Sequence, residues 1–346
     1  MPSPRSRRLL LAVLAVSGAW VTAAAQTGET AAGFAGSAAT TSSLSAATLA
    51  PPTWFAASQE CVPDGTVGFR AATSATGRGS LTLATPGGVA AGDVLVAQVA
   101  IRSSDTPVTA PDAWTPVRQD ANPQVVQVVY VRVAVAGEPA THTFTWSGST
   151  RAVGGIAAYT GVSPSVPVDA HAGSSGTGTS MVAPSVTTTT AGTRIVAVFG
   201  LRQGTMTSPP EMAERWNVNS SGGAGSVTGA LADEAFGGPG QTGSRTAASS
   251  NGNFEWVAQL VALRPRSSPR AALTWTPTTS TFADGYRLQR WVGSTQQSEV
   301  TLTPRSTAAA TDADIVAGTT VAWRLRSFHR SWVSTQASTS LTVQAC

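Results

Sequence analysis

Apolar runs separated by Gly, Pro, Asn and Asp fill the middle of this 346-residue chain, from residue 66 to residue 265. Short apolar runs bounded by turn-forming residues are typical of β-strands. We predict strands at residues 80–84, 93–101, 114–118, 125–135, 141–146, 152–159, 181–188, 194–201, 226–233 and 254–263. The pattern therefore predicts an all-β region.

The runs are of two kinds. Residues 94–101 (VLVAQVAI) are almost continuously apolar, which suits a strand covered on both faces, although a short buried helix has the same pattern. Residues 141–146 (THTFTW) alternate instead, so His142, Phe144 and Trp146 share one face of a strand and the three threonines share the other.

This middle region also repeats itself. Residues 92–102 (GDVLVAQVAIR) align with residues 192–202 (GTRIVAVFGLR), and the apolar run at 153–159 corresponds to the run at 257–263. Two related halves of about 100 residues are typical of a duplicated double-sheet sandwich or jelly roll. We expect both halves to be needed to close one core and count residues 62–268 as one domain.

The last part of the chain has a different sequence pattern, with the segments AALTWTP at 271–277, FADGYRLQR at 282–290, TTVAWRLR at 319–326 and SWVS at 331–334. It resembles a fibronectin type III domain, with strand B and its core Trp, strand C, strand F and the entry to strand G. Strand A is missing there.

In that family strand A opens with a Pro-rich phrase such as APPT, which here stands at 50–53. The resemblance thus implies one discontinuous fibronectin type III (Ig-like) sandwich, residues 49–61 plus 269–346, split after strand A by the inserted domain. The inserted part resembles modules of about 200 residues in actinobacterial secreted and surface proteins. That resemblance implies a fold and a compartment but no reaction.

The N-terminus predicts export. Residues 1–25 have the pattern of a signal peptide: arginines at 5, 7 and 8, an apolar run from residue 9 to residue 16, and AAA at 23–25. An uncleaved N-terminal anchor is the alternative, and residues 26–48 read as a flexible spacer. Either reading makes the protein secreted or cell-surface, and membrane contact is expected only through an uncleaved leader.

An exported chain with two cysteines is expected to pair them, because the compartment is oxidising. Cys61 would end strand A and Cys346 follows the expected strand G, so the resemblance implies a Cys61–Cys346 disulfide. Two free or intermolecular thiols are the alternative.

Charge excludes one class of partner. The chain has 22 basic residues, all arginine, against 18 acidic ones. Three of these arginines lie in the leader, which leaves 19 against 18, a net charge of +1. Without a basic stripe the sequence gives no electrostatic footprint for nucleic acid, so we expect no nucleic-acid partner.

The sequence offers no assembled catalytic or cofactor motif. His142, His171 and His329 are scattered, so we expect no metal and no cofactor. We expect a non-enzymatic protein. A cryptic glycoside hydrolase is the alternative, because paired carboxylates converge only in a fold. The candidates by region are Asp112, Asp169, Glu211, Asp233 and Glu234.

The chain contains ten tryptophans, which is its most unusual feature. Trp275 and Trp323 fit the core of the fibronectin-like part, whereas Trp114, Trp216 and Trp291 lie beside turns and could form an aromatic platform for sugar rings. We therefore predict a structural, adhesive or ligand-binding role, with a polysaccharide or a cell-envelope or matrix component as partner. A carbohydrate-binding accessory module of polysaccharide degradation is the alternative.

Overall fold

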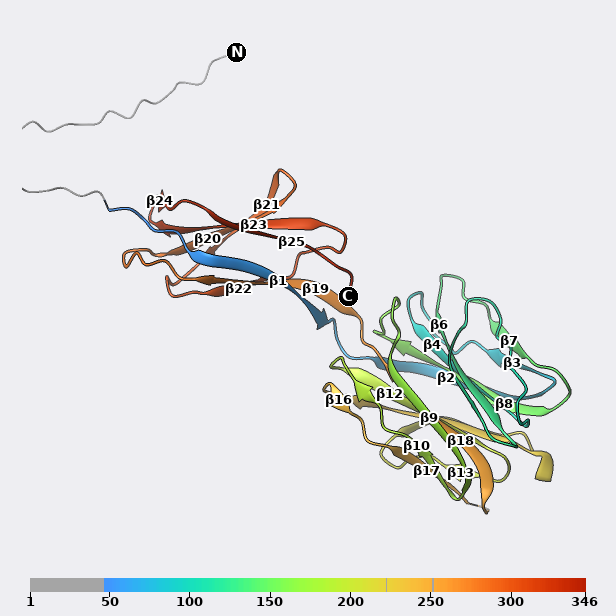
Figure 1. The fold of residues 1–346 in the computed structure, drawn as a ribbon. Helices are drawn as coiled ribbons and strands as arrows, with labels where there is room; N and C mark the ends of the chain where they lie inside the picture. Colours follow the sequence, from blue (N-terminus) through green and yellow to red (C-terminus); the bar gives the residue numbers. More distant parts are fainter. Residues whose placement is uncertain (1–46, 222, 251) are drawn as a thin grey trace, which may run out of the picture. The chain divides into compact units, whose positions relative to one another are not determined.

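The computed structural model describes residues 47–346 except 222 and 251, and these residues form strands and turns (Figure 1). Their helical structure is confined to one 3₁₀ turn, η1 (Gly223–Gly225). The prediction of an all-β fold is confirmed. The predicted leader, 1–25, and nearly all of the spacer, 26–48, lie outside the described residues. In the described part of the chain, no helix is long and apolar enough to cross a membrane.

The C-terminal residues form two antiparallel sheets together with a strand from the beginning of the described chain. One sheet contains β1 (Thr53–Pro63), β19 (Ser267–Thr276) and β22 (Ala309–Asp312), in that order. The other contains β21 (Thr295–Leu302), β20 (Gly285–Val292), β23 (Thr320–His329) and β24 (Trp332–Val333), and β25 (Ala337–Thr342) also pairs with β23. The segments expected as strands A and B are neighbours in one sheet, and those expected as C, F and G lie in the other.

β1 is joined to this sandwich along its whole length. It pairs with β19 from Thr53 to Pro63, and its Phe55 packs edge-to-face on Trp275 with ring centroids 6.1 Å apart. Near its end the side-chain amide of Gln59 accepts a hydrogen bond from the Gln344 backbone N–H (2.7 Å) and donates one to its carbonyl (2.9 Å).

Cys61 of β1 is bonded to Cys346, the last residue of the chain, across a sequence separation of 285. The predicted disulfide is confirmed. It ties the end of β1 to the segment that follows β25, on the side where Gln59 already bridges the two.

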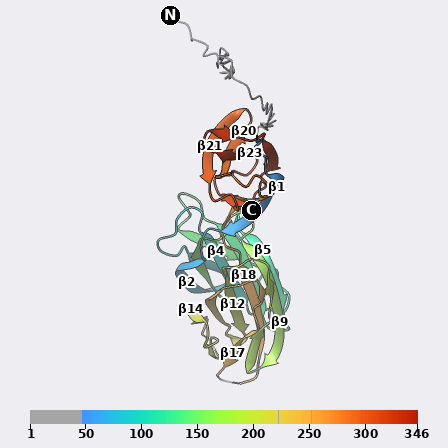
Figure 2. The same cartoon turned by 90° about the vertical axis from the view of Figure 1, so that its left-hand side faces the viewer.

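The middle region contains two five-stranded antiparallel sheets (Figures 1 and 2). The first has the order β2 (Gly68–Arg78), β8 (Arg151–Thr160), β4 (Val94–Ile101), β6 (Val126–Val133), β5 (Thr115–Ala121). The second has the order β9 (Val168–Gly178), β18 (Phe254–Leu263), β12 (Thr193–Leu201), β15 (Thr228–Phe236), β14 (Ala213–Asn219). Corresponding strands of the two halves take the same places, so the repeat in the sequence is a repeat of topology.

Each half adds short outer strands. The first half has β3 (Ser80–Ala84) paired with β7 (Thr141–Thr145). The second has β10 (Ser180–Ala183), β17 (Arg245–Ser249) and β13 (Met206–Thr207), and the pair β11 (Thr187–Thr188) with β16 (Gly240–Gln241).

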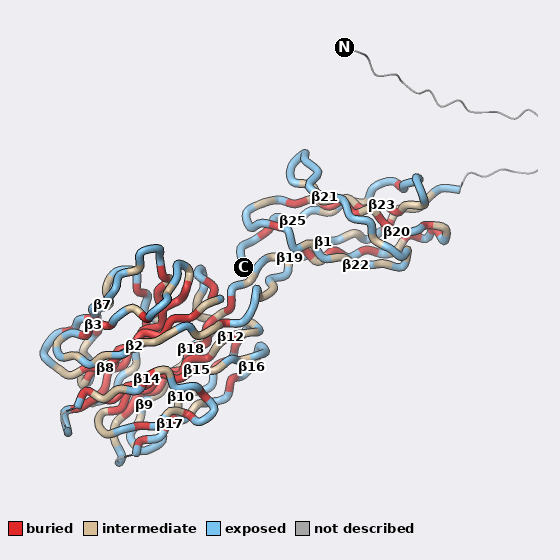
Figure 3. The backbone as a smooth tube through the Cα atoms, turned by 180° about the vertical axis from the view of Figure 1, so that it is seen from behind, coloured by how far each residue is buried: buried red, intermediate tan, exposed pale blue. Residues whose placement is uncertain are grey.

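Three buried clusters explain the apolar runs. One contains Leu81 and Phe144 of the first half, and a second contains Met181 and Phe199 of the second half. A third joins residues of both five-stranded sheets, such as Val96 and Val198 (Figure 3). The two large sheets therefore face each other, and β4 and β12 are covered on both faces. The expectation of a single shared core is corrected: each half also closes a core of its own, because it folds outer strands over its sheet.

The contacts between the two halves differ at the two junctions of their large sheets, β2 with β14 and β5 with β9. On one side the ring of Trp216 lies over Gly155, where an added Cβ would come within 2.5 Å of it. On the other side Gln127 donates to Gln259 (3.1 Å), which donates to Asp120 (2.7 Å). A large ring over a glycine and a chain of buried amide hydrogen bonds are both specific contacts, so they fix one arrangement of the halves.

Candidate functional site

Two of the three tryptophans predicted to bind sugar are inside the protein. Trp114 and Trp216 are each 7% exposed, because each ring packs between layers of the middle region. The structure corrects the expectation that these rings form a platform. Trp291 is half-buried, and the guanidinium of Arg324 lies 3.8 Å over its ring and covers one face.

Trp114 is held by a buried histidine. Its indole Nε1–H donates to Nδ1 of His142 (3.2 Å), so Nδ1 must be unprotonated, and Nε2 lies 3.4 Å from Glu138. Burial lowers the pKa of His142, and the Glu138 carboxylate opposes this shift only in part. The pair stabilises the outer layer of the first half in the neutral state of the histidine.

Asp233 is fully buried between the two five-stranded sheets. It accepts a hydrogen bond from the Tyr159 hydroxyl (2.8 Å) and ion pairs from Arg194 (2.5 Å) and Arg215 (2.9 Å). Burial, and then the charge of Asp233, raise the pKa of Tyr159 well above its usual value. With both oxygens engaged, this buried carboxylate balances two half-buried arginines.

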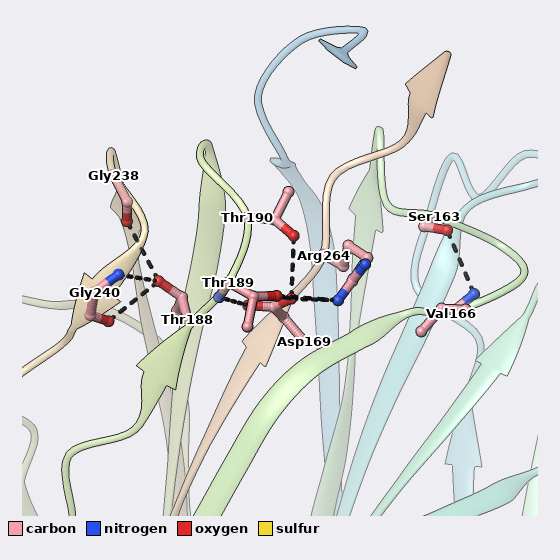
Figure 4. Close-up of polar contacts among 9 residues, drawn as sticks. All are labelled: Ser163, Val166, Asp169, Thr188, Thr189, Thr190, Gly238, Gly240 and Arg264. Atoms are coloured by element: carbon pink, nitrogen blue, oxygen red, sulfur yellow. Dashed lines mark hydrogen bonds and ion pairs between the residues drawn. The ribbon is translucent and has the colours of Figure 1, made fainter. Parts of the chain in front are cut away.

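Asp169, at the beginning of β9, is engaged in the same way (Figure 4). It accepts from the Thr189 backbone N–H (2.6 Å), the Thr190 hydroxyl (3.1 Å) and Arg264 (2.7 Å). Burial works to raise the pKa of Asp169, but these hydrogen bonds and the arginine outweigh it and leave that pKa lowered. The carboxylate ties β9 to the turn before β12 and to the end of β18.

The other candidate acids are in ordinary surface settings. Glu234 lies 2.5 Å from Arg245, Glu211 lies 3.6 Å from the same arginine, and Asp112 is exposed. The structure thus brings Glu211 and Glu234 to one arginine, Arg245, whereas Asp169 and Asp233 pair with other arginines. The glycoside hydrolase alternative stays a prediction.

A groove lies where β5, the last strand of the first large sheet, meets the chain leading into β9. Two cavities of about 390 and 460 Å³ share Thr115, Val131, Ser165 and Pro167 and so form one groove. One wall is the turn at 163–166, which is fixed by a hydrogen bond from the Val166 N–H to the Ser163 hydroxyl (3.4 Å; Figure 4). The groove is shallow and lined by both apolar and polar side chains, with His171 at its rim.

Two tryptophans of the C-terminal sandwich, which sequence reasoning did not single out, face solvent. Trp54 at the beginning of β1 is 87% exposed, and Trp332 in β24 is 57% exposed. The Ser327 hydroxyl of β23 donates to the carbonyl of Ala50 (2.6 Å), so the beginning of β1 and the β23–β24 hairpin lie at the same end of the sandwich, where the described chain begins (Figure 1).

Local backbone geometry places both rings in solvent. The β1–β19 register shifts between Thr53 and Ala56, so Trp54 sits in a bulge, with φ at +53°. This conformation costs a bulky residue on the order of 1–2 kcal/mol. Trp332 follows the two-residue turn Arg330–Ser331 of the β23–β24 hairpin, in which Arg330 also has positive φ.

Comparison with known proteins adds little. No protein-family model matches the chain, and no curated protein matches it. A crystal structure of chicken CNTN1 FN1-FN3 domains is 11% identical and covers 82% of this chain and 100% of that one, with a TM-score of 0.21. A TM-score this low carries no argument about this chain.

Proposed function

We propose that this chain is an exported, non-enzymatic protein of the cell surface or extracellular space, and that it binds its partner through Trp54 and Trp332. The observation that carries the proposal is the exposure of both rings, one of them at the energetic cost of positive φ. Strain of this kind persists where the surrounding structure imposes it, and it is concentrated at functional sites.

The rings are large enough to supply the affinity of an adhesive contact. A tryptophan carries roughly 150–250 Å² of surface, and removing about 150 Å² from water contributes about 4 kcal/mol before the costs of association. Exposed tryptophans are also enriched among the residues that dominate binding energies. The disulfide at Cys61 supports a role outside the cytoplasm.

A carbohydrate-binding accessory module is the second candidate. The same two exposed rings favour it, because a flat aromatic face stacks on a sugar ring. In both candidates Trp54 and Trp332 make the contact, and the partner's chemistry separates them.

The test is a binding screen with the full chain and defined probes: insoluble cellulose, chitin and immobilised collagen. Replacing Trp54 and Trp332 together by alanine should weaken any retained binding at least tenfold, whereas the matched control Trp291→Ala should keep it. Retention on cellulose or chitin would support the accessory module, and retention on collagen the adhesive role. Unchanged binding of the double variant, or no binding to any probe, would contradict the proposal.

The domain organisation is also a proposal: residues 49–61 and 269–346 form one domain, and residues 62–268 are inserted into it. The β1–β19 pairing, the packing of Phe55 on Trp275 and the disulfide support it. A variant that lacks residues 62–268, with the ends joined by a short turn, should leave a folded domain of roughly 90 residues. An unfolded product, seen by circular dichroism, would count against the proposal.

A further inference from the structure

The duplication makes it possible to compare the two halves position by position. In the first half β5 bulges between Pro116 and Arg118, and in the second half β14 bulges between Glu214 and Trp216. The extra residues are Val117 and Arg215, so these two occupy equivalent places.

The edge strands β2 and β9 correspond in the same way. Phe69 pairs with Tyr159, whose partner on β4 is Val94. Val168 pairs with Leu263, whose partner on β12 is Arg194. Residues 94 and 194 are equivalent in the repeat, so Val168 is the counterpart of Phe69.

At the junction of β2 and β14, a ring and a guanidinium fill the space between the two large sheets. Arg215 stacks 3.8 Å over the ring of Phe69, and that ring packs edge-to-face on Tyr159 at 5.9 Å. At the equivalent junction of β5 and β9, the corresponding side chains are Val117 and Val168, which are much smaller. Both valines line the cavity of about 460 Å³ described above. The groove at the β5–β9 junction is thus the place where the equivalent β2–β14 junction holds an aromatic ring.

We propose that this groove accepts an aromatic side chain from an extended segment of a partner protein, in the position that Phe69 takes at the equivalent β2–β14 junction. Its apolar lining includes Val117, Val131 and Val168, and the carboxylate that lines it, Asp169, is already satisfied by Thr189 and Arg264. A ring therefore enters without leaving a charge unpaired.

The shape of the site selects an extended chain. β5 and β9 are the terminal strands of their sheets, and the groove follows the line where they meet. Edge strands and apolar side-chain pockets are the combination that recognises extended peptides. A sugar ring fits less well, because among the residues lining the groove only His171 carries an aromatic ring. The inference does not rest on Trp54 and Trp332, which belong to the other sandwich.

The test uses the full chain and capped, fluorescein-labelled peptides of alternating threonine and valine with Phe, Leu or Ala at the centre. The Phe peptide should bind at least tenfold more tightly than the Ala peptide. In methyl NMR spectra it should shift Val117, Val131 and Val168.

Val117→Arg combined with Val168→Phe rebuilds the Arg215–Phe69 pair of the β2–β14 junction and should abolish this preference, whereas Val135→Phe, at an exposed position outside the groove, should not. The NMR shifts of the unmodified protein decide the question even if the double variant misfolds. Equal affinity for the three peptides, shifts confined to other valines, or displacement of the Phe peptide by cellohexaose would overturn the inference.

Discussion

The disulfide gives the sharpest test of how the chain is divided. Replacing Cys61 and Cys346 together by serine removes a link between the end of β1 and the last residue. What the link contributes to stability depends on the length of the loop that it closes in the unfolded state. That length depends on whether the middle region stays folded when the C-terminal sandwich unfolds.

The β1–β19 pairing extends to Pro63 opposite Ser267, so a folded middle region holds the ends of the C-terminal sandwich next to each other. The disulfide then closes the stretch from 267 to 346 and a few residues of β1, roughly 80 residues. The chain-entropy relation gives about 4–5 kcal/mol at 25 °C for a loop of that length. In a domain of roughly 90 residues this corresponds to a fall in Tm of about 15–30 °C.

Differential scanning calorimetry measures the effect. The unmodified protein should show two transitions, and the Cys61→Ser, Cys346→Ser variant should lower only the one that belongs to the C-terminal sandwich. Adding a reductant to the unmodified protein is the control and should reproduce the variant. A single transition that shifts as a whole, or no shift at all, would refute the reasoning.

Two further predictions concern the middle region. Gly155→Ala should destabilise it by about 3 kcal/mol in urea unfolding, because the new methyl meets the backbone of β2 and the ring of Trp216 at 2.5 Å. Gly65→Ala, with no atom within 4 Å, should change stability by less than about 0.5 kcal/mol, and equal losses would contradict the packing argument. Burial lowers the pKa of His142, so the unfolded state binds the proton more readily than the folded state. The contribution of neutral His142 to the free energy of unfolding is therefore fully present above the unfolded pKa of about 6.5 and is lost as the pH falls below that value. Urea unfolding at pH 7.5 and 5.5 should show a smaller loss for His142→Gln than for the unmodified protein, and identical losses would count against the role of the Trp114 contact.

The strands that the sequence predicts best are those with a decisive burial pattern. Residues 93–101 became β4 and residues 194–201 became β12, because both are covered on two faces and are therefore almost continuously apolar. The alternating run at 141–146 became β7, with its threonines outward.

The long edge strands were missed. β2 (GFRAATSATGR) and β9 (VDAHAGSSGTG) consist largely of Ala, Ser, Thr and Gly, so neither has an apolar run. Small residues suit these places because side chains of the facing sheet lie against them: a Cβ on Gly173 of β9 would lie 2.2 Å from Asp120. Such a requirement comes from the other half of the chain, and local sequence does not contain it.

The exposure of the tryptophans also depends on contacts that local sequence does not contain. The sequence predicts Trp216 beside a turn, yet it lies within β14, where Gly155 of β8 and Gly229 of β15 make room for its ring. For Trp54 a clue was present: adjacent residues of a strand face opposite sides, so an inward Phe55 turns Trp54 outward. The bulge that sets its φ depends on the register with β19, more than 200 residues away in the sequence.

The central claim, that Trp54 and Trp332 make the contact with the partner, is tested most directly by oxidative footprinting on isolated cell envelopes of the producing organism. In the free protein both rings should be oxidised faster than the buried Trp114. On envelopes that retain the protein, oxidation of Trp54 and Trp332 should slow at least fivefold while Trp291 stays unchanged. Retained protein whose Trp54 and Trp332 are oxidised as fast as in solution would contradict the claim.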